Sequence, residues 1–224
     1  MPIRLFVWPP VEGADIPKDY VGVTVESWGV NGVHVGIIYR TSQGGAWIMH
    51  HQGHFDLQHG NPKTGQIVAI CPIDKIEIPT IAQFFKQLYR KNKRKGFPYG
   101  FNSAGAQWFS EDGTFTQPDG TLGFCCQTFV LAAYSAAGAP LLEPPDSEPR
   151  VDDAARQLAL LDSFADQLVD AKPDTQQHFA AVRAAVGISL SRPLEVSGAA
   201  LAESIPCTLA IAQELAGQIS GLLI

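Results

Sequence analysis

The sequence predicts an α+β fold, because strand-like and helix-like segments are largely separated along the chain. Segments rich in β-branched and aromatic residues fill most of the first 72 positions, as expected for the strands of a sheet. An Ala-rich apolar stretch then follows the pair Cys125 and Cys126, and beyond Arg150 the composition changes to Ala, Leu, Gln and Asp. We therefore expect an antiparallel sheet packed on a cysteine-bearing helix, followed by a C-terminal helical extension.

The expected strands are bounded by Gly, Pro or polar residues. They cover residues 3–8, 20–28, 33–40, 46–52 and 66–72. A Gly-containing turn at 41–45 separates the third strand from the fourth. Residues 33–52 are therefore predicted to form a β-hairpin with a loop of about five residues.

Helices are expected after these strands. Thr80 can cap a helix whose apolar residues recur at helical spacing as far as Leu88, and the basic run 90–95 followed by Gly96 ends it. Residues 96–123 are predicted to form a structured loop with a short helix near 101–109. The cysteine-bearing helix should run from Cys126 to about residue 137. Tail helices are expected at about 152–169, 174–186 and 199–223.

A linker separates these two parts in the predicted domain organisation. Residues 141–150 contain three prolines and four charged residues, a composition typical of an irregular connection. We predict one domain over 1–142, a linker over 143–150 and a helical extension over 151–224 that packs on the first domain. The apolar stripes of the tail helices, for example Leu158, Leu161 and Leu168, require such burial.

Composition and charge exclude several classes of protein. The chain has 224 residues, of which 46% are hydrophobic and 17% charged, as in a globular protein. A formal net charge of −6 disfavours a nucleic-acid partner, and the basic run 90–95 is interpreted as a solvated helix end. We expect no membrane span, because polar residues interrupt the apolar segment 197–224. No secretory signal is recognised, so a cytoplasmic location is expected, with export by a signal-independent route left open.

The four cysteines suggest a reduced protein with a reactive thiol. They are Cys71, Cys125, Cys126 and Cys207, and adjacent cysteines rarely bridge each other. A cysteine in the first turn of a helix meets backbone N–H groups and the positive end of the dipole, which favours the thiolate. Cys126 is the preferred nucleophile and Cys125 the alternative. The competing interpretation is that both are small core residues.

The histidines supply a candidate base. Five of the six lie between His34 and His59. In the predicted hairpin His34 lies opposite about Gln52, and His50 is its diagonal neighbour on the same face. His34 and His50 could thus serve as the base and its orienting partner in a Cys/His/His triad with Cys126. A shift of one residue in the register would select His51 instead of His50.

These segments resemble a known enzyme family. The string HVGIIY at 34–39, followed by WIMH at 47–50, is similar to the histidine hairpin of NlpC-type cell-wall endopeptidases, which are papain-like. The string CQTFV at 126–130 resembles their nucleophile helix. In those enzymes the cysteine helix precedes the hairpin, whereas here it follows. That order is similar to the circularly permuted branch, which holds bacterial amidase-like proteins, and to lecithin:retinol acyltransferase-like enzymes.

The resemblance covers about residues 33–138 and carries implications for fold and activity. It implies a permuted papain-like fold and a cysteine peptidase or amidase that cleaves an amide or ester bond through an acyl-enzyme. Tyr99, in the setting Pro98-Tyr99-Gly100, would line the oxyanion site; the alternative is a packing role. The chain departs from the family at Cys125, where relatives often have Asp or Asn, and in the tail, which has no matching counterpart.

Other functions stay open at this stage. A zinc hydrolase would draw on His50, His51, His54 and His59, although Asp56 is the only acid near them. A non-catalytic member of the fold that binds a peptide or a lipid, and a lipid acyl hydrolase or acyltransferase, are further alternatives. We expect no cofactor and no metal. The expected partner is a peptide or acyl substrate, such as a cell-wall peptide; the exact substrate and the oligomeric state are not assigned by the sequence.

Overall fold

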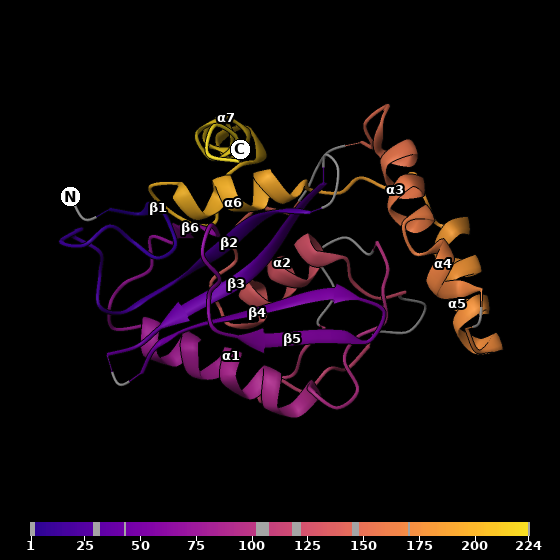
Figure 1. Cartoon of the computed structure of the whole chain (residues 1–224), viewed down its shortest axis with the longest axis horizontal. Coiled ribbons are helices and arrows are strands. Elements are labelled where there is room, and N and C mark those ends of the chain that lie inside the picture. The colour runs from indigo at the N-terminus through magenta and orange to yellow at the C-terminus, as the bar shows by residue number, and fades with distance from the viewer. Residues whose placement is uncertain are drawn as a thin grey trace.

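The strands form an antiparallel sheet, and their order in the sheet differs from their order along the chain. The computed structural model describes residues 3–28, 32–42, 44–101, 108–117, 122–144, 148–169 and 171–223. Within them six strands are arranged as β1-β6-β2-β3-β4-β5 (Figure 1). The strands are β1 (Leu5–Val7), β2 (Tyr20–Trp28), β3 (Gly32–Arg40), β4 (Ala46–Gly53), β5 (Asp56–Gly60) and β6 (Ile67–Ile70). The predicted α+β class is confirmed.

One strand is not predicted by the sequence, and some helices in the second half of the chain have other bounds than the sequence predicts. β5 was not expected; it pairs with β4 through a tight connection in which Phe55 has a φ of 59°. The helices are α1 (Ile78–Asn92), α2 (Cys126–Ala136), α3 (Asp153–Asp162), α4 (Ala165–Leu168), α5 (Pro173–Ala184), α6 (Pro193–Leu201) and α7 (Leu209–Ser220). The short helix expected near 101–109 falls mostly on 102–107, which lie outside the described residues.

The single helix expected over 199–223 is wrong. α6 begins earlier, at Pro193, and ends at Leu201, while α7 begins after Thr208, whose hydroxyl accepts a hydrogen bond from the Ile211 N–H. Pro206 lies between them, where its missing N–H and its ring oppose a continuous helix. The two helices pack against each other as a hairpin. The apolar pattern predicts helical structure in this segment but not the break between α6 and α7.

The two faces of the sheet have different neighbours. Side chains alternate along each strand, and Val35 and Ile37 of β3 belong to the main core together with α1, α2 and α6. Ile38 of β3 belongs to a smaller core on the opposite face, with Ile48 of β4 and the N-terminal Trp8. The helices α1, α2 and α6 therefore cover one face, and this arrangement decides on which side each candidate residue lies.

The tail contacts the rest of the protein in two separate places. α6 lies along the sheet, and its Val196 and Ala199 are fully buried in the main core. Helices α3, α4 and α5 stand together at one end of the sheet (Figure 1). There Leu161 and Phe179 form a second core with Tyr99. The tail thus shares apolar cores with the sheet-bearing part of the chain, and the domain division predicted from the sequence stays a prediction.

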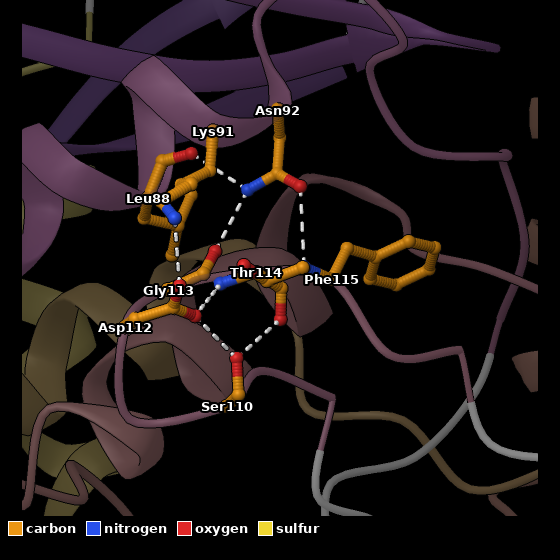
Figure 2. Close-up of polar contacts among 8 residues, drawn as sticks. All are labelled: Leu88, Lys91, Asn92, Ser110, Asp112, Gly113, Thr114 and Phe115. Carbon is orange, nitrogen blue, oxygen red and sulfur yellow. Dashed lines mark hydrogen bonds and ion pairs between the residues drawn. The ribbon is translucent and has the colours of Figure 1, made fainter.

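A docked loop holds the segment that leads into α2. Figure 2 shows Asn92 at the end of α1, facing the loop 110–115. Its amide nitrogen donates to Leu88 O (2.6 Å) and Gly113 O (2.8 Å), and its side-chain oxygen accepts from the Phe115 N–H (3.2 Å). Phe115 in turn lies 5.7 Å from the Phe124 ring, centroid to centroid. Asn92 therefore fixes the loop against which the residue preceding the two cysteines packs.

Replacing Asn92 should destabilise the protein. Asn92→Ala leaves buried loop groups without partners, and we expect a loss of about 3 kcal/mol in the free energy of unfolding. The matched control is Lys91→Ala, which removes only the exposed ion pair with Asp112 and should leave that free energy nearly unchanged. Urea unfolding measures both. Equal effects of the two substitutions would contradict this role for Asn92.

A second test concerns the contact between α6 and α7. A Cβ on Gly198 would lie 2.1 Å from the Ala212 carbonyl oxygen, whereas one on Gly217 would meet nothing within 4 Å. Gly198→Ala should therefore cost about 1–3 kcal/mol through overpacking. Gly217→Ala, within the exposed face of α7, should stabilise by about 0.5–1 kcal/mol. Thermal or urea unfolding decides, and a neutral Gly198→Ala would show that the helices can move apart.

Candidate functional site

The site lies where β3 and β4 separate. Their pairing runs from Arg40 opposite Ala46 to Ile37 opposite Met49, while β2 continues to pair with β3 as far as Gly32. Beyond the last β3–β4 pair, His34 and His50 are joined through their rings instead: His34 Nε2 lies 2.9 Å from His50 Nδ1. The structure thus brings the two histidines together in the diagonal arrangement that the hairpin register predicts.

Gly36 makes room for this pair of histidines. It lies between His34 and Ile38 on the same face of β3, and a Cβ on it would stand 2.9 Å from the His50 Cβ and 3.1 Å from the Met49 carbonyl oxygen. Any larger residue would push β4 or the His50 side chain away. The close approach of β4 at this position therefore explains the glycine in the HVGIIY string.

Burial keeps both rings neutral. His34 is 7% exposed and His50 5%, and the Trp28 ring lies 5.0 Å from the His34 ring, centroid to centroid. Burial, followed by the neighbouring His50, lowers the pKa of His34 to about 3. Burial also lowers the pKa of His50, although Glu26 opposes that change. Two neutral rings at 2.9 Å require one facing nitrogen to carry the hydrogen and the other to accept it.

Cys126 occupies the first turn of α2 and lies against β3. The Val35 backbone, next in sequence to His34, hydrogen-bonds to the Cys126 thiol group. The thiol also donates to Gln127 Oε1 at 3.2 Å. Among the described residues, no hydrogen bond joins the Cys126 sulfur to the His34 ring. The sulfur therefore stands beside the strand that carries the histidine without being bonded to its ring.

The thiolate expected from the helix N-terminus is wrong for this state of the protein. Burial, and after it the neighbouring Cys125, raises the pKa of Cys126 to about 12. The hydrogen bond from the Val35 backbone and the N–H groups at the helix start oppose this rise but do not cancel it. Cys126 and His34 are therefore a neutral thiol and a neutral imidazole, rather than an ion pair.

The opposite faces of β3 explain why thiol and ring are separate. Val35 points into the core that contains α2, so His34, one residue away, points to the other face. The cysteine helix and the histidine pair lie on different sides of the sheet. The two come together only at the edge of β3 that β4 leaves unpaired, where the Cys126 thiol group hydrogen-bonds to the Val35 backbone.

Cys125 has a structural role. It is the N-cap of α2 and is 2% exposed. Its N–H donates to Thr128 Oγ1 at 3.0 Å, and its sulfur lies 3.3 Å from the same hydroxyl, so the pair forms a capping box. Burial raises its pKa. Cys126 is the less buried of the two residues.

His51 and Tyr99 are both buried by packing. His51 is 1% exposed, lies among aromatic rings of the main core and donates from Nε2 to the Phe124 carbonyl oxygen at 3.0 Å; burial lowers its pKa to about 4. Tyr99 packs on Phe164 and Phe179 of the tail. Burial, followed by the electrostatic effect of Cys125 and Cys126, raises its pKa.

The zinc set weighed from the sequence is not assembled. His50 and His51 point to opposite faces of β4, His54 Nδ1 accepts from the Tyr99 N–H, and His59 Nε2 lies 2.6 Å from the Tyr39 hydroxyl. A different group is close enough to hold one metal ion within the described residues. It consists of Glu26, His34 and His50, with one ligand atom of each within 4.8 Å of the others.

Sequence reasoning missed Glu26. It lies on β2, directly opposite His34 in the β2–β3 register, and its Oε2 accepts from Gln66 Nε2 at 3.0 Å. Pairing the strand 20–28 with the hairpin could have found it, since the two strands are consecutive in the chain. Glu26 also borders a cavity of about 250 Å³, which Lys63, Gln66 and the C-terminal Leu222 and Leu223 help to line.

Comparison with known proteins assigns no family. No family model, curated protein or solved structure matches the chain. The helices of the described part are too short or too polar for any of them to cross a membrane. The resemblance found in the sequence therefore stays a hypothesis, and the function is argued from the site.

The buried histidines make stability depend on pH. In the unfolded chain a histidine has a pKa of about 6.5, whereas His34 and His51 have pKa values of about 3 and about 4 in the folded protein. Below pH 6.5 the unfolded chain binds more protons, so stability falls as the pH is lowered. Each of these two histidines should contribute about 1.4 kcal/mol per pH unit near pH 5.

Urea unfolding between pH 7 and about 4.5 measures this slope. His34→Gln removes one of the two groups and should make the decline shallower by about one proton, whatever its effect on stability at pH 7. An unchanged slope in that variant, or stability that stays flat over this range, would contradict the buried neutral state of the ring.

Proposed function

We propose that the protein is a cysteine hydrolase that cleaves an amide or ester bond through an acyl-enzyme. Cys126 is the nucleophile, His34 the base and His50 the residue that orients it. The observation that carries the proposal is the buried His34–His50 hydrogen bond on the strand whose Val35 backbone contacts the Cys126 thiol group. A permuted papain-like fold, with the histidine hairpin before the cysteine helix, is part of the same proposal.

The position of the hydrogen between the two histidines decides whether His34 can act as a base. If His34 Nε2–H donates to His50 Nδ1 across the 2.9 Å contact, the other nitrogen of His34, Nδ1, carries a lone pair and can accept a proton. His50 then stabilises the imidazolium that forms on His34, as the third member of a triad does. The reverse tautomer leaves His34 Nδ1 protonated and inactive as a base.

The neutral resting pair implies general-base catalysis. This step requires the Cys126 thiol to leave Gln127 Oε1 and to pass the unpaired edge of β3, because the thiol and the His34 ring lie on different sides of the sheet. His34 Nδ1 then takes the thiol proton as the sulfur attacks the carbonyl carbon. The amine or alcohol leaves with that proton, and a thioester to Cys126 forms. Water, deprotonated by His34, then attacks the thioester and regenerates the thiol and the neutral ring.

The oxyanion of each tetrahedral intermediate needs donors. The backbone N–H of Cys126 at the start of α2 is one candidate, since it is preorganised by the helix. The Tyr99 hydroxyl is the second, and it stays protonated at neutral pH because burial and the two thiols raise its pKa. The family resemblance favours a peptidoglycan stem peptide as the amide substrate; a lipid acyl group fits the same chemistry.

A binding role without catalysis is the alternative. The pKa of about 12 for the Cys126 thiol, and its hydrogen bond to Gln127 in place of His34, favour it. In that case the protein would bind a peptide or a lipid without cleaving it, and the thiol would be a small packing residue. The two proposals differ in whether acyl transfer to sulfur occurs.

Acyl transfer to Cys126 is the direct test. With p-nitrophenyl acetate as a generic acyl donor, the wild-type chain should release nitrophenol in a burst and gain one acetyl group by intact mass. Cys126→Ala should abolish both with the fold retained, and His34→Gln should slow the reaction by about 10²–10⁴-fold.

Cys125→Ala is the matched control. It removes a cap and a buried sulfur, so some stability is lost, but acetylation should persist. If the acetyl group maps to Cys125, the nucleophile is misassigned. If neither cysteine is acetylated by the folded wild-type protein, with p-nitrophenyl esters or with peptidoglycan fragments, the hydrolase proposal fails and the binding role stands.

A further inference from the structure

We propose that Glu26, His34 and His50 form a binding site for a divalent transition-metal ion of the zinc class, and that the ion blocks His34 from acting as a base. Only the effect of the ion on His34 as a base rests on the proposed function. The binding site itself is argued from the three side chains, which come from the adjacent strands β2, β3 and β4.

The two imidazoles need little movement to bind an ion. In a tetrahedral site with Zn–N distances of about 2.0–2.1 Å, two ligand nitrogens stand about 3.3 Å apart. His34 Nε2 and His50 Nδ1 are 2.9 Å apart, so a separation of roughly 0.4 Å more would admit the ion. The Glu26 carboxylate oxygen is within 4.8 Å of both nitrogens and supplies the third ligand.

The protein already holds the carboxylate in place. Gln66 is 3% exposed and donates from Nε2 to Glu26 Oε2 at 3.0 Å. Such outer hydrogen bonds orient the ligands of metal sites. Glu26 lines a cavity that opens to solvent, whereas His34 and His50 are not among its lining residues. Two imidazoles and one carboxylate suit zinc, iron(II) and neighbouring ions, and they leave a fourth position open.

One nearby charge opposes the ion. Lys63 lines the same cavity as Glu26, and its positive charge acts on both His34 and His50. Its side chain is exposed, so it can turn toward solvent when an ion binds. Removing this lysine should therefore raise the affinity of the site for the ion. The proposal can thus be tested by a variant that binds the ion more tightly, as well as by variants that bind it more weakly.

Binding also changes the tautomer of His34. In the catalytic form Nε2 carries the hydrogen and Nδ1 the lone pair. When the ion takes the lone pairs of His34 Nε2 and His50 Nδ1, the hydrogen of His34 moves to Nδ1, with no net release of protons from the two rings. His34 Nδ1 is then a donor and cannot accept the proton of Cys126. Metal binding and base catalysis therefore exclude each other at this histidine.

Zinc binding to the full chain can be measured without any activity. Competition with a chromophoric chelator should give one Zn²⁺ per chain for the wild type and for Cys126→Ala, since the thiol is not a ligand. Glu26→Gln and His50→Gln should each weaken binding by at least about 10-fold, and Lys63→Ala should tighten it. His59→Gln, a half-buried histidine elsewhere, is the control and should bind as the wild type does.

Two further readouts separate this proposal from its alternatives. The visible spectrum of bound Co²⁺ should be unchanged by Cys126→Ala, because no sulfur is coordinated. Loss of Zn²⁺ binding in Cys126→Ala would place the ion on the thiol and overturn the proposal. Unaltered affinity in folded Glu26→Gln and His50→Gln, checked by their melting curves, would overturn it as well.

The hydrolase and the metal site can fail separately. Acetylation of Cys126 that is suppressed by stoichiometric Zn²⁺ and restored by a chelator is expected if both hold. Zinc that binds through Glu26, His34 and His50 in a chain that is never acetylated would remove the hydrolase and keep the site. Acetylation that Zn²⁺ does not affect, in a chain that binds no Zn²⁺, would support the hydrolase and overturn the metal site.

Discussion

The early end of the β3–β4 pairing is the constraint on which the candidate site depends. A strand that stayed paired along its whole length would use its backbone groups for the ladder. Because β4 withdraws after Met49, the Val35 backbone can contact the Cys126 thiol group and the rings of His34 and His50 replace the missing backbone pairs. The separation is thus what allows one short stretch of β3 to contact a helix start through its backbone while its His34 ring pairs with His50 on the other face.

Desolvation then decides the protonation of this site. The rise in the pKa of Cys126 from 9 to about 12 corresponds to about 4 kcal/mol against the thiolate. The helix N-terminus supplies only about 0.3–1 kcal/mol in favour of a nearby anion, and up to about 2 kcal/mol in partly buried sites. Burial therefore wins over the dipole, for the same reason that it keeps His34 neutral. A substrate that displaces these contacts changes both groups together.

The strands of the sheet and the pairing of His34 with His50 could be predicted from sequence, because both depend on local periodicity. The Gly-rich turn and the alternation in 33–52 set the register within one hairpin. What could not be predicted required distant partners. β5 is short and polar, with only Leu57 buried, and Glu26 acquires meaning only when β2 is paired with β3. The charge of Cys126 depends on burial by elements far away in the chain.

The tail shows why apolar pattern alone underdetermines a function. Its helices were recognised by their stripes, yet those stripes do not say which surface they cover. In the structure Phe164 packs on Gly53 at the end of β4 and on Tyr99. At another place Leu222 and Leu223 line the cavity at Glu26. The extension therefore contacts Tyr99 at one place and lines the cavity at Glu26 at another, and a change in how it packs would alter the surroundings of both residues without any substitution in β3 or α2.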